Sequence, residues 1–261
     1  MGKLIALFDF EFNRNKRNYV IIISTFCFLL IARLIINLNS YNYIMNKIVS
    51  KINTKQNLGT FGFNNLITYN EVLLFLIGLG VCLLYSIIIW NKDFVGKNKS
   101  IYTFYMLPQS KINMYISKFL NIISLVYMYI IFYILTLFIA YKLMPLMMNG
   151  SIRNFGFSTS IIDTFFIVFP FSLDIFIYNY VIVLINIISI IFMFLLFIRY
   201  SKIYKLKDLI YVLLMIIYMV FIFIKVYFLY INTMQINIVM CLLTTIINIF
   251  VSYKILKKIE L

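Results

Sequence analysis

The stretch Phe119–Tyr141 reads FLNIISLVYMYIIFYILTLFIAY and contains no charged residue. A helix of about 20 apolar residues is long enough to cross the hydrocarbon core of a bilayer, which is about 30 Å thick. Lipid offers the backbone no hydrogen-bond partner, and this run lacks the polar–apolar alternation of a barrel strand. The stretch therefore predicts a membrane-spanning α-helix, and with it the class of the fold.

The rest of the chain has the same character. Its 261 residues are 64% hydrophobic and 12% charged, whereas soluble proteins average about 45–50% apolar and about 25% charged residues. We therefore expect an all-α, polytopic membrane protein in which residues 1–18 precede a single transmembrane domain, residues 19–261. The six predicted spans are Tyr19–Leu38, Tyr69–Trp90, Phe119–Tyr141, Asp174–Ile198, Leu209–Leu229 and Ile236–Tyr253.

The distribution of Lys and Arg predicts the orientation of these spans. Of the 23 cationic residues, 16 lie before span one, between spans two and three, between spans four and five, or after span six, and the other connections hold five. Cytoplasmic loops carry the excess of positive charge. Both termini are therefore predicted to be cytoplasmic, and the net charge of +15 indicates topology and anionic lipid, not nucleic acid.

Two amphipathic segments flank span one. Lys3–Phe12 places four large apolar residues at helical spacing, which predicts an interfacial helix along the inner leaflet, with a disordered tail as the alternative. Tyr41–Ile52 similarly predicts an amphipathic helix on the outer side.

The sequence predicts neither a catalytic nor a metal site. It has no histidine, its eight acidic residues are scattered, and Cys27, Cys82 and Cys241 are single residues within apolar spans. It also lacks a P-loop, so it is not expected to bind or hydrolyse ATP itself. We therefore predict a protein that is not an enzyme and binds no cofactor of its own.

The longest inner connection is Asn91–Lys118, NKDFVGKNKSIYTFYMLPQSKINMYISK. Ile101, Phe104 and Tyr105 share one helical face, and Pro108 ends that helix. Ser110 can cap a second helix that leads directly into span three. We expect its apolar stripe to consist of Ile112, Tyr115, Ile116 and Phe119, with Lys111 and Lys118 set off that stripe. The pattern predicts a helix–turn–helix knob, and an ordinary basic loop with an interfacial helix is the alternative.

This segment resembles the inner loop of ABC-2 type transporter permeases, in which such a pattern forms the coupling helix. The matching positions are Thr103, Leu107, Pro108, Ser110, Lys111, Tyr115 and Lys118. The N-terminal LFDFEFNRNKRNYV is similar to the entry helix of that family, with Glu11 at a position where a Glu commonly stands. The resemblance covers about 40 residues in motif, and the whole chain in architecture.

The resemblance implies a permease subunit of a bacterial cell membrane that pairs with a second permease chain and exports an amphipathic peptide, antibiotic or other hydrophobic substrate. A separate ABC ATPase would hold ATP and Mg and dock on the knob. The implied coupling residues are Ile101, Thr103, Phe104, Tyr105, Leu107, Pro108, Ser110, Lys111 and Tyr115. The alternatives are a stand-alone secondary transporter or channel, and a membrane-anchored sensor or scaffold.

Four charged residues lie within the spans or open them near the outer end: Arg33, Glu71, Asp174 and Lys225. Charges within spans usually face a bundle interior or water. They predict an outer gate or polar vestibule, with Arg33–Glu71 and Lys225–Asp174 as candidate pairs. The alternative is that each side chain snorkels to the interface.

Overall fold

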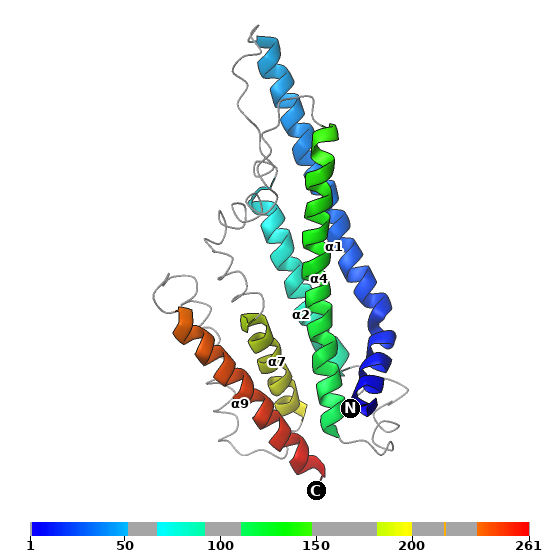
Figure 1. Ribbon diagram of the computed structural model, residues 1–261, viewed down its shortest axis with the longest axis vertical. Coiled ribbons are helices and arrows are strands. Elements are labelled where there is room, and N and C mark those ends of the chain that lie inside the picture. The colour runs from blue at the N-terminus through cyan, green and yellow to red at the C-terminus, as the bar shows by residue number, and fades with distance from the viewer. Residues whose placement is uncertain are drawn as a thin grey trace. The chain divides into compact units, whose positions relative to one another are not determined.

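The computed structural model describes residues 2–51, 67–91, 111–147, 182–199, 217 and 234–260. Across these ranges the chain is helical, without a strand. The helices labelled in Figure 1 are α1 (Gly2–Lys51), α2 (Tyr69–Asn91), α4 (Lys111–Met147), α7 (Leu184–Arg199) and α9 (Met234–Glu260). The predicted all-α class is confirmed for this part of the chain.

Three of the helices are long and apolar enough to cross a membrane. The candidate spans are Leu4–Tyr43 in α1, Asn70–Ile89 in α2 and Ile112–Met144 in α4, and they contain most or all of the first three predicted spans. Shorter apolar stretches lie in α7 and α9, which overlap predicted spans four and six. Span five lies outside the described residues except for Ile217. The structure is thus compatible with membrane insertion, and the number of six spans stays a prediction.

Two helices extend well beyond a bilayer crossing. The 50 residues of α1 make a helix about 75 Å long, and no break separates the predicted interfacial segment Lys3–Phe12 from span one. The 37 residues of α4 begin directly after Ser110 and run through span three to Met147. The second helix of the inner connection therefore continues into the span, as predicted.

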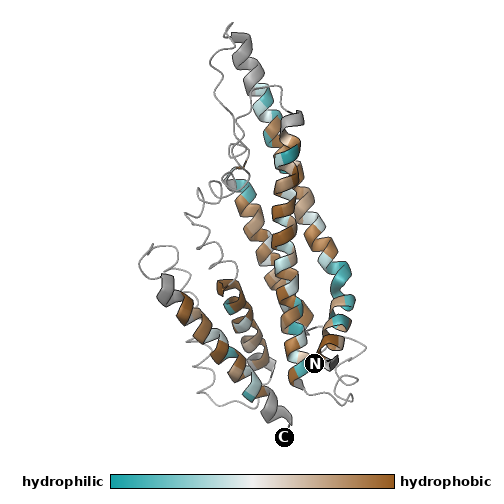
Figure 2. Cartoon of the chain, viewed as in Figure 1, coloured by the Kyte–Doolittle hydropathy of each residue, from teal (hydrophilic) through white to brown (hydrophobic). Residues whose placement is uncertain are grey.

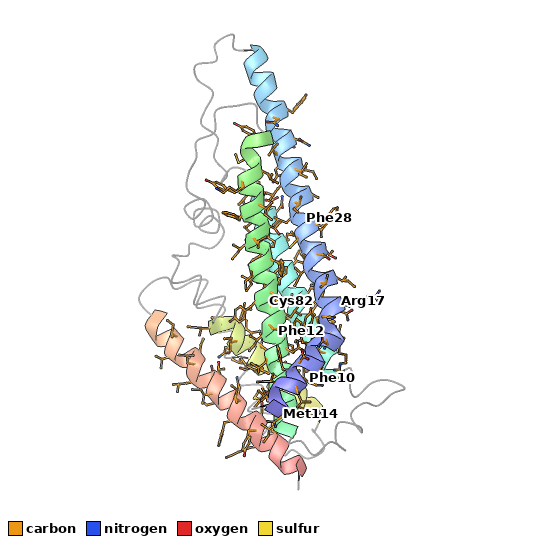
Figure 3. All side chains as sticks on the ribbon, turned by 45° about the vertical axis from the view of Figure 1, so that its right-hand side comes forward. Phe10, Phe12, Arg17, Phe28, Cys82 and Met114 are labelled. Atoms are coloured by element: carbon orange, nitrogen blue, oxygen red, sulfur yellow. The ribbon has the colours of Figure 1, made fainter. Side chains whose placement is uncertain are left out.

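Many large apolar side chains of the described helices are exposed. Figure 2 shows hydrophobic residues, in brown, along α2 and α4. Phe28 is 70% exposed and points outward from α1 (Figure 3), and Ile131 and Ile246 are exposed by 60% and 63%. In water such surfaces would promote association, whereas hydrocarbon solvates them. Their distribution agrees with a lipid-facing surface.

The chain divides into two compact units, and α1, α2 and α4 contribute residues to both. The three-helix unit comprises Lys16–Cys82 and Leu125–Leu173. Within it, Phe75 and Glu71 of α2 meet Tyr129 and Tyr133 of α4 in reverse order, so these two helices run antiparallel. Large side chains from the three helices, including Phe26, Phe75 and Tyr129, form its core.

The α7–α9 unit comprises Met1–Asn15, Leu83–Ser124 and Asp174–Leu261. Asn186 of α7 contacts Cys241 and Thr245 of α9, and Ser189, one turn further on, contacts Asn248. The contacts advance in the same direction along both helices. Helices α7 and α9 therefore pack side by side in parallel (Figure 1).

Candidate functional site

A capping box positions Glu71 at the start of α2. Thr68 precedes the helix and Glu71 is its third residue, which is the spacing of the Thr-x-x-Glu motif. The Thr68 N–H donates to Glu71 Oε2 at 2.6 Å, the Thr68 hydroxyl donates to the same oxygen, and the Glu71 N–H donates to the Thr68 carbonyl at 3.2 Å. The carboxylate thus accepts from one backbone N–H at the helix start and from the Thr68 hydroxyl.

Helix α1 adds two side chains one turn apart. Asn37 Nδ2 donates to Glu71 Oε1 at 2.9 Å, and Arg33 Nε lies 3.4 Å from the same oxygen. The Glu71 side chain is only 1% exposed, whereas that of Arg33 is 41% exposed. A buried carboxylate is costly unless it is hydrogen-bonded and paired, and here both oxygens have donors. We call Thr68, Glu71, Arg33 and Asn37 the Glu71 junction.

Two tyrosines of α4 bind the backbone of α2 beside this junction. The Tyr133 hydroxyl donates to the Glu71 carbonyl at 2.7 Å, and the Tyr129 hydroxyl donates to the Phe75 carbonyl at 3.1 Å. Phe75 packs against both rings, with centroids 5.7 Å from Tyr129 and 4.8 Å from Tyr133. These contacts fix α4 against the first turns of α2.

Gly78 makes room for Tyr129. A Cβ atom at residue 78 would overlap the hydroxyl end of the Tyr129 ring, whereas one at Gly80 would meet nothing. Because residue 78 has no side chain, the tyrosine hydroxyl can reach the Phe75 carbonyl one turn earlier. The Gly-x-Gly pattern therefore contains one residue required for close packing and one that is not.

The α7–α9 unit contains a neutral polar contact, which we call the α7–α9 seam: Asn186, Ser189, Cys241, Thr244, Thr245 and Asn248. The Asn186 Nδ2 amide donates to the Cys241 carbonyl at 2.8 Å and to the Thr245 hydroxyl at 3.2 Å. Asn248 Nδ2 donates to Ser189 Oγ at 3.2 Å, and both residues are fully buried. Amides and hydroxyls of this kind hold helices together in lipid, where small residues also let backbones approach.

Tyr115 connects the beginning of α4 to both helices of the seam. Its hydroxyl donates to Ser252 Oγ of α9 at 3.0 Å, and its ring packs at 5.6 Å against Phe192 of α7. Phe119, one turn further along α4, packs against the same Phe192. Tyr115 is 5% exposed, so it faces the interior of this unit. Figure 3 marks the neighbouring Met114.

The N-terminal turns of α1 contain a second buried carboxylate. Glu11 Oε2 lies 2.7 Å from Arg14 Nη2, and the Asn15 amide donates to the Glu11 carbonyl at 2.9 Å. Tyr85 of α2 donates to Asn15 Oδ1 at 3.4 Å. The Tyr85–Asn15 contact joins the beginning of α1, where Phe10 and Phe12 also lie (Figure 3), to α2.

The described residues include only part of the predicted site. Arg33 and Glu71 lie within ion-pair distance, as one of the two candidate pairs, while Asp174 and Lys225 lie outside the described residues. The same applies to Ile101, Thr103, Phe104, Tyr105, Leu107, Pro108 and Ser110 of the knob. Lys111 begins α4, and only its backbone is described.

One expectation at the start of α4 was wrong. Lys118 was predicted to lie apart from the apolar stripe of Tyr115, but it is only 4% exposed. Residues 115, 118 and 122 are spaced by i, i+3 and i+7, so they share one face of the helix. The buried face of α4 therefore includes a lysine.

Other polar contacts among the described residues were not predicted from the sequence. Thr68 and Glu71 form a capping box whose spacing is visible in the sequence, and this signal was available. Asn37, Asn186 and Asn248 are asparagines within or beside apolar runs, which in a membrane protein is itself an indication of a partner. No group of His, Cys, Asp and Glu suited to a metal ion occurs among the residues that the structure describes.

Comparison with known proteins adds no family assignment. No protein-family model, curated protein or solved structure matches this chain.

Proposed function

We propose that this chain is the membrane-spanning permease subunit of an ATP-driven exporter of the ABC-2 type. Two permease chains would form the pathway, and a separate ATPase that binds ATP and Mg would dock on the knob between spans two and three. The observation that carries the proposal is the continuity of α4. The helix begins at Lys111, within the segment that resembles the coupling loop, and continues through the apolar span to Met147.

Such a helix can transmit a displacement from the cytoplasmic side. A rigid helix moves as one body when its end is pushed. Tyr115 lies in the second turn of α4 and is bound to Ser252 and packed against Phe192. Movement of the start of α4 would therefore act directly on α7 and α9, without passing through a flexible connection.

The parallel packing of α7 and α9 supports the six-span topology within this proposal. In a chain that crosses the bilayer at every span, spans four and six run in the same direction. Helices α7 and α9 overlap these two predicted spans and are parallel. The crossing between them, Leu209–Leu229, and the cytoplasmic position of both termini remain predictions.

The substrate class follows from the composition. A chain that is 64% hydrophobic and 19% aromatic offers apolar contact area. An amphipathic peptide, an antibiotic or another hydrophobic compound would suit such a pathway. Export of such a compound is the activity that we propose.

Substitutions in the inner connection test the proposal in the assembled complex. Phe104→Ala removes an aromatic anchor, and loss of such an anchor costs about 2 kcal/mol or a thirtyfold loss of affinity. It should release the ATPase. Tyr115→Phe keeps the ring and removes the hydroxyl bonded to Ser252, so the ATPase should stay bound while ATP-driven transport of a fluorescent amphipathic peptide into inverted vesicles falls.

Two further variants serve as comparisons. Pro108→Ala should leave partial ATPase binding but uncouple hydrolysis from transport, because a helix that continues through residue 108 would misorient the knob. Lys111→Gln should change mainly the salt dependence of binding. If Phe104→Ala and Pro108→Ala both leave binding and transport unchanged, the segment is an ordinary basic loop. Uptake without any ATPase would instead favour a stand-alone secondary transporter or channel.

A further inference from the structure

In the described part of the chain, the contact of the Arg33 guanidinium with Glu71 is at its Nε edge. The Nε atom lies 3.4 Å from Glu71 Oε1, which is the longest of the contacts that the carboxylate makes. The Thr68 N–H, the Thr68 hydroxyl and the Asn37 amide satisfy Glu71 at hydrogen-bond distance. The carboxylate orients the guanidinium, but it does not occupy most of its donors.

The opposite edge of the guanidinium has no partner among the residues that the structure describes. A guanidinium has five N–H donors in a planar fork, and four of them belong to Nη1 and Nη2. Within the described part of the chain, these two nitrogens make no hydrogen bond. The Arg33 side chain is 41% exposed, although it belongs to an apolar helix. An arginine in such a place needs a partner of its own.

The level of Arg33 along the helices indicates where that partner lies. Glu71 is in the first turn of α2, and its contact with Arg33 places Arg33 level with the start of that apolar helix. Leu38, the end of the apolar run in α1, is five residues further on, about 7.5 Å along the axis. A long cationic side chain at this depth reaches the headgroup region of the bilayer.

We propose that the Nη edge of Arg33 binds an oxyanion, and that its source is the phosphodiester of a phospholipid in the adjacent leaflet. Two parallel N–H groups of an arginine match two phosphate oxygens, which a lysine cannot do. Glu71, buried and capped, keeps the guanidinium plane in one orientation. The site depends on the membrane insertion proposed above, but not on ATP-driven export.

The experiment measures lipid retained by the full chain purified in dodecyl maltoside. Native mass spectrometry counts dioleoylphosphatidylglycerol bound to the wild type and to variants at equal added lipid. Loss of a charge-assisted pair of hydrogen bonds weakens binding about tenfold. We expect this loss for Arg33→Gln and a smaller loss for Arg33→Lys, which keeps the charge without the fork.

Matched variants separate the site from net charge and from misfolding. Arg17→Gln removes the same charge from an exposed position on α1 (Figure 3) and should retain lipid like the wild type. Arg33→Gln alone leaves the buried Glu71 carboxylate without its cation, which could disturb folding. The Glu71→Gln variant is therefore compared with the double variant Glu71→Gln/Arg33→Gln, because neither contains an unpaired buried carboxylate. Bound phosphatidylglycerol should persist in Glu71→Gln and fall about tenfold in the double variant.

Two probes identify the source of the oxyanion. Binding of dioleoylglycerol, which has no phosphate, should be the same in the wild type and in Arg33→Gln. Excess inorganic phosphate should not displace the lipid if the phosphodiester is the occupant, and displacement would assign the site to a free oxyanion instead. The proposal is overturned if Arg33→Gln and the double variant retain as much phosphatidylglycerol as their parents, or if Arg17→Gln loses as much as Arg33→Gln.

Discussion

The Glu71 junction and the α7–α9 seam both place polar side chains between apolar helices, but they satisfy those side chains with different chemical groups. The junction contains a carboxylate and a guanidinium and lies at the first turn of α2. The seam contains only amides, hydroxyls and a backbone carbonyl, and lies along the interior of two parallel helices.

The difference follows from what a helix end and a helix interior can offer. At a helix start, backbone N–H groups lack partners, so a carboxylate there gains hydrogen bonds that it would not find elsewhere. In a helix interior the backbone is already satisfied, and a neutral amide that donates to one carbonyl and a few hydroxyls costs less to bury than a charge. The two regions should therefore respond to truncation by different amounts.

The largest effect is expected at Glu71. Glu71→Ala removes the carboxylate that accepts from the Thr68 N–H and hydroxyl, and it takes away the acceptor that Arg33 and Asn37 share. This loss should cost about 3 kcal/mol of unfolding free energy. The measurement is unfolding in mixed micelles of dodecyl maltoside and dodecyl sulfate. Asn70→Ala, an exposed neighbour in the same turn, should change stability little. Equal losses of unfolding free energy in Glu71→Ala and Asn70→Ala would mean that the contacts of Glu71 contribute no more stability than an exposed side chain does.

The next largest loss of stability is expected at Gly78, which packs against Tyr129 beside the junction. Gly78→Ala should destabilise by about 1–3 kcal/mol because the methyl group displaces the Tyr129 hydroxyl from the Phe75 carbonyl. Gly80→Ala adds the same methyl to open space and should be neutral or stabilising by about 0.5–1 kcal/mol. Tyr129→Phe should partly rescue Gly78→Ala in a double variant. A Gly80→Ala loss as large as that of Gly78→Ala would remove the steric explanation.

The smallest effect is expected at the seam. Asn186→Ala removes the amide that donates to Cys241 and Thr245, and hydrogen bonds between membrane helices contribute about 0.6 kcal/mol on average. We expect a loss near 1 kcal/mol, well below that of Glu71→Ala. A double-variant cycle with Thr245→Ala isolates the pairwise energy. If Asn186→Ala lowers the unfolding free energy more than Glu71→Ala does, the seam contributes more stability than the junction, contrary to this account.

The sequence was informative where a pattern repeats over many residues. Long apolar runs predicted three helices that are long and apolar enough to cross a membrane, and the uninterrupted stretch after Ser110 predicted that the inner helix continues into the third of them. The charge pattern also led to Arg33 and Glu71 as a candidate pair, and they lie together. These inferences depend on properties that each helix carries in its own sequence.

The contacts between helices were not predictable in the same way. Nothing local to Tyr115 shows that it will bind Ser252, which is 137 residues away, or that Lys118 will share its buried face. The roles of Gly78 and Gly80 look equivalent in the sequence and differ only because α4 places Tyr129 against one of them. Such features depend on the register between helices, which single-sequence patterns do not encode.

The most direct test of the proposed function is the composition of the complex in native membranes. The affinity-tagged chain is extracted in mild detergent, and the proteins retained with it are identified and assayed for ATP hydrolysis. The proposal predicts a soluble ATPase with a P-loop, retained in equal amount with the wild type and lost with Phe104→Ala, while Lys111→Gln keeps it at low salt. A wild-type chain that is purified from active membranes without any ATPase, and transports without ATP, would contradict it.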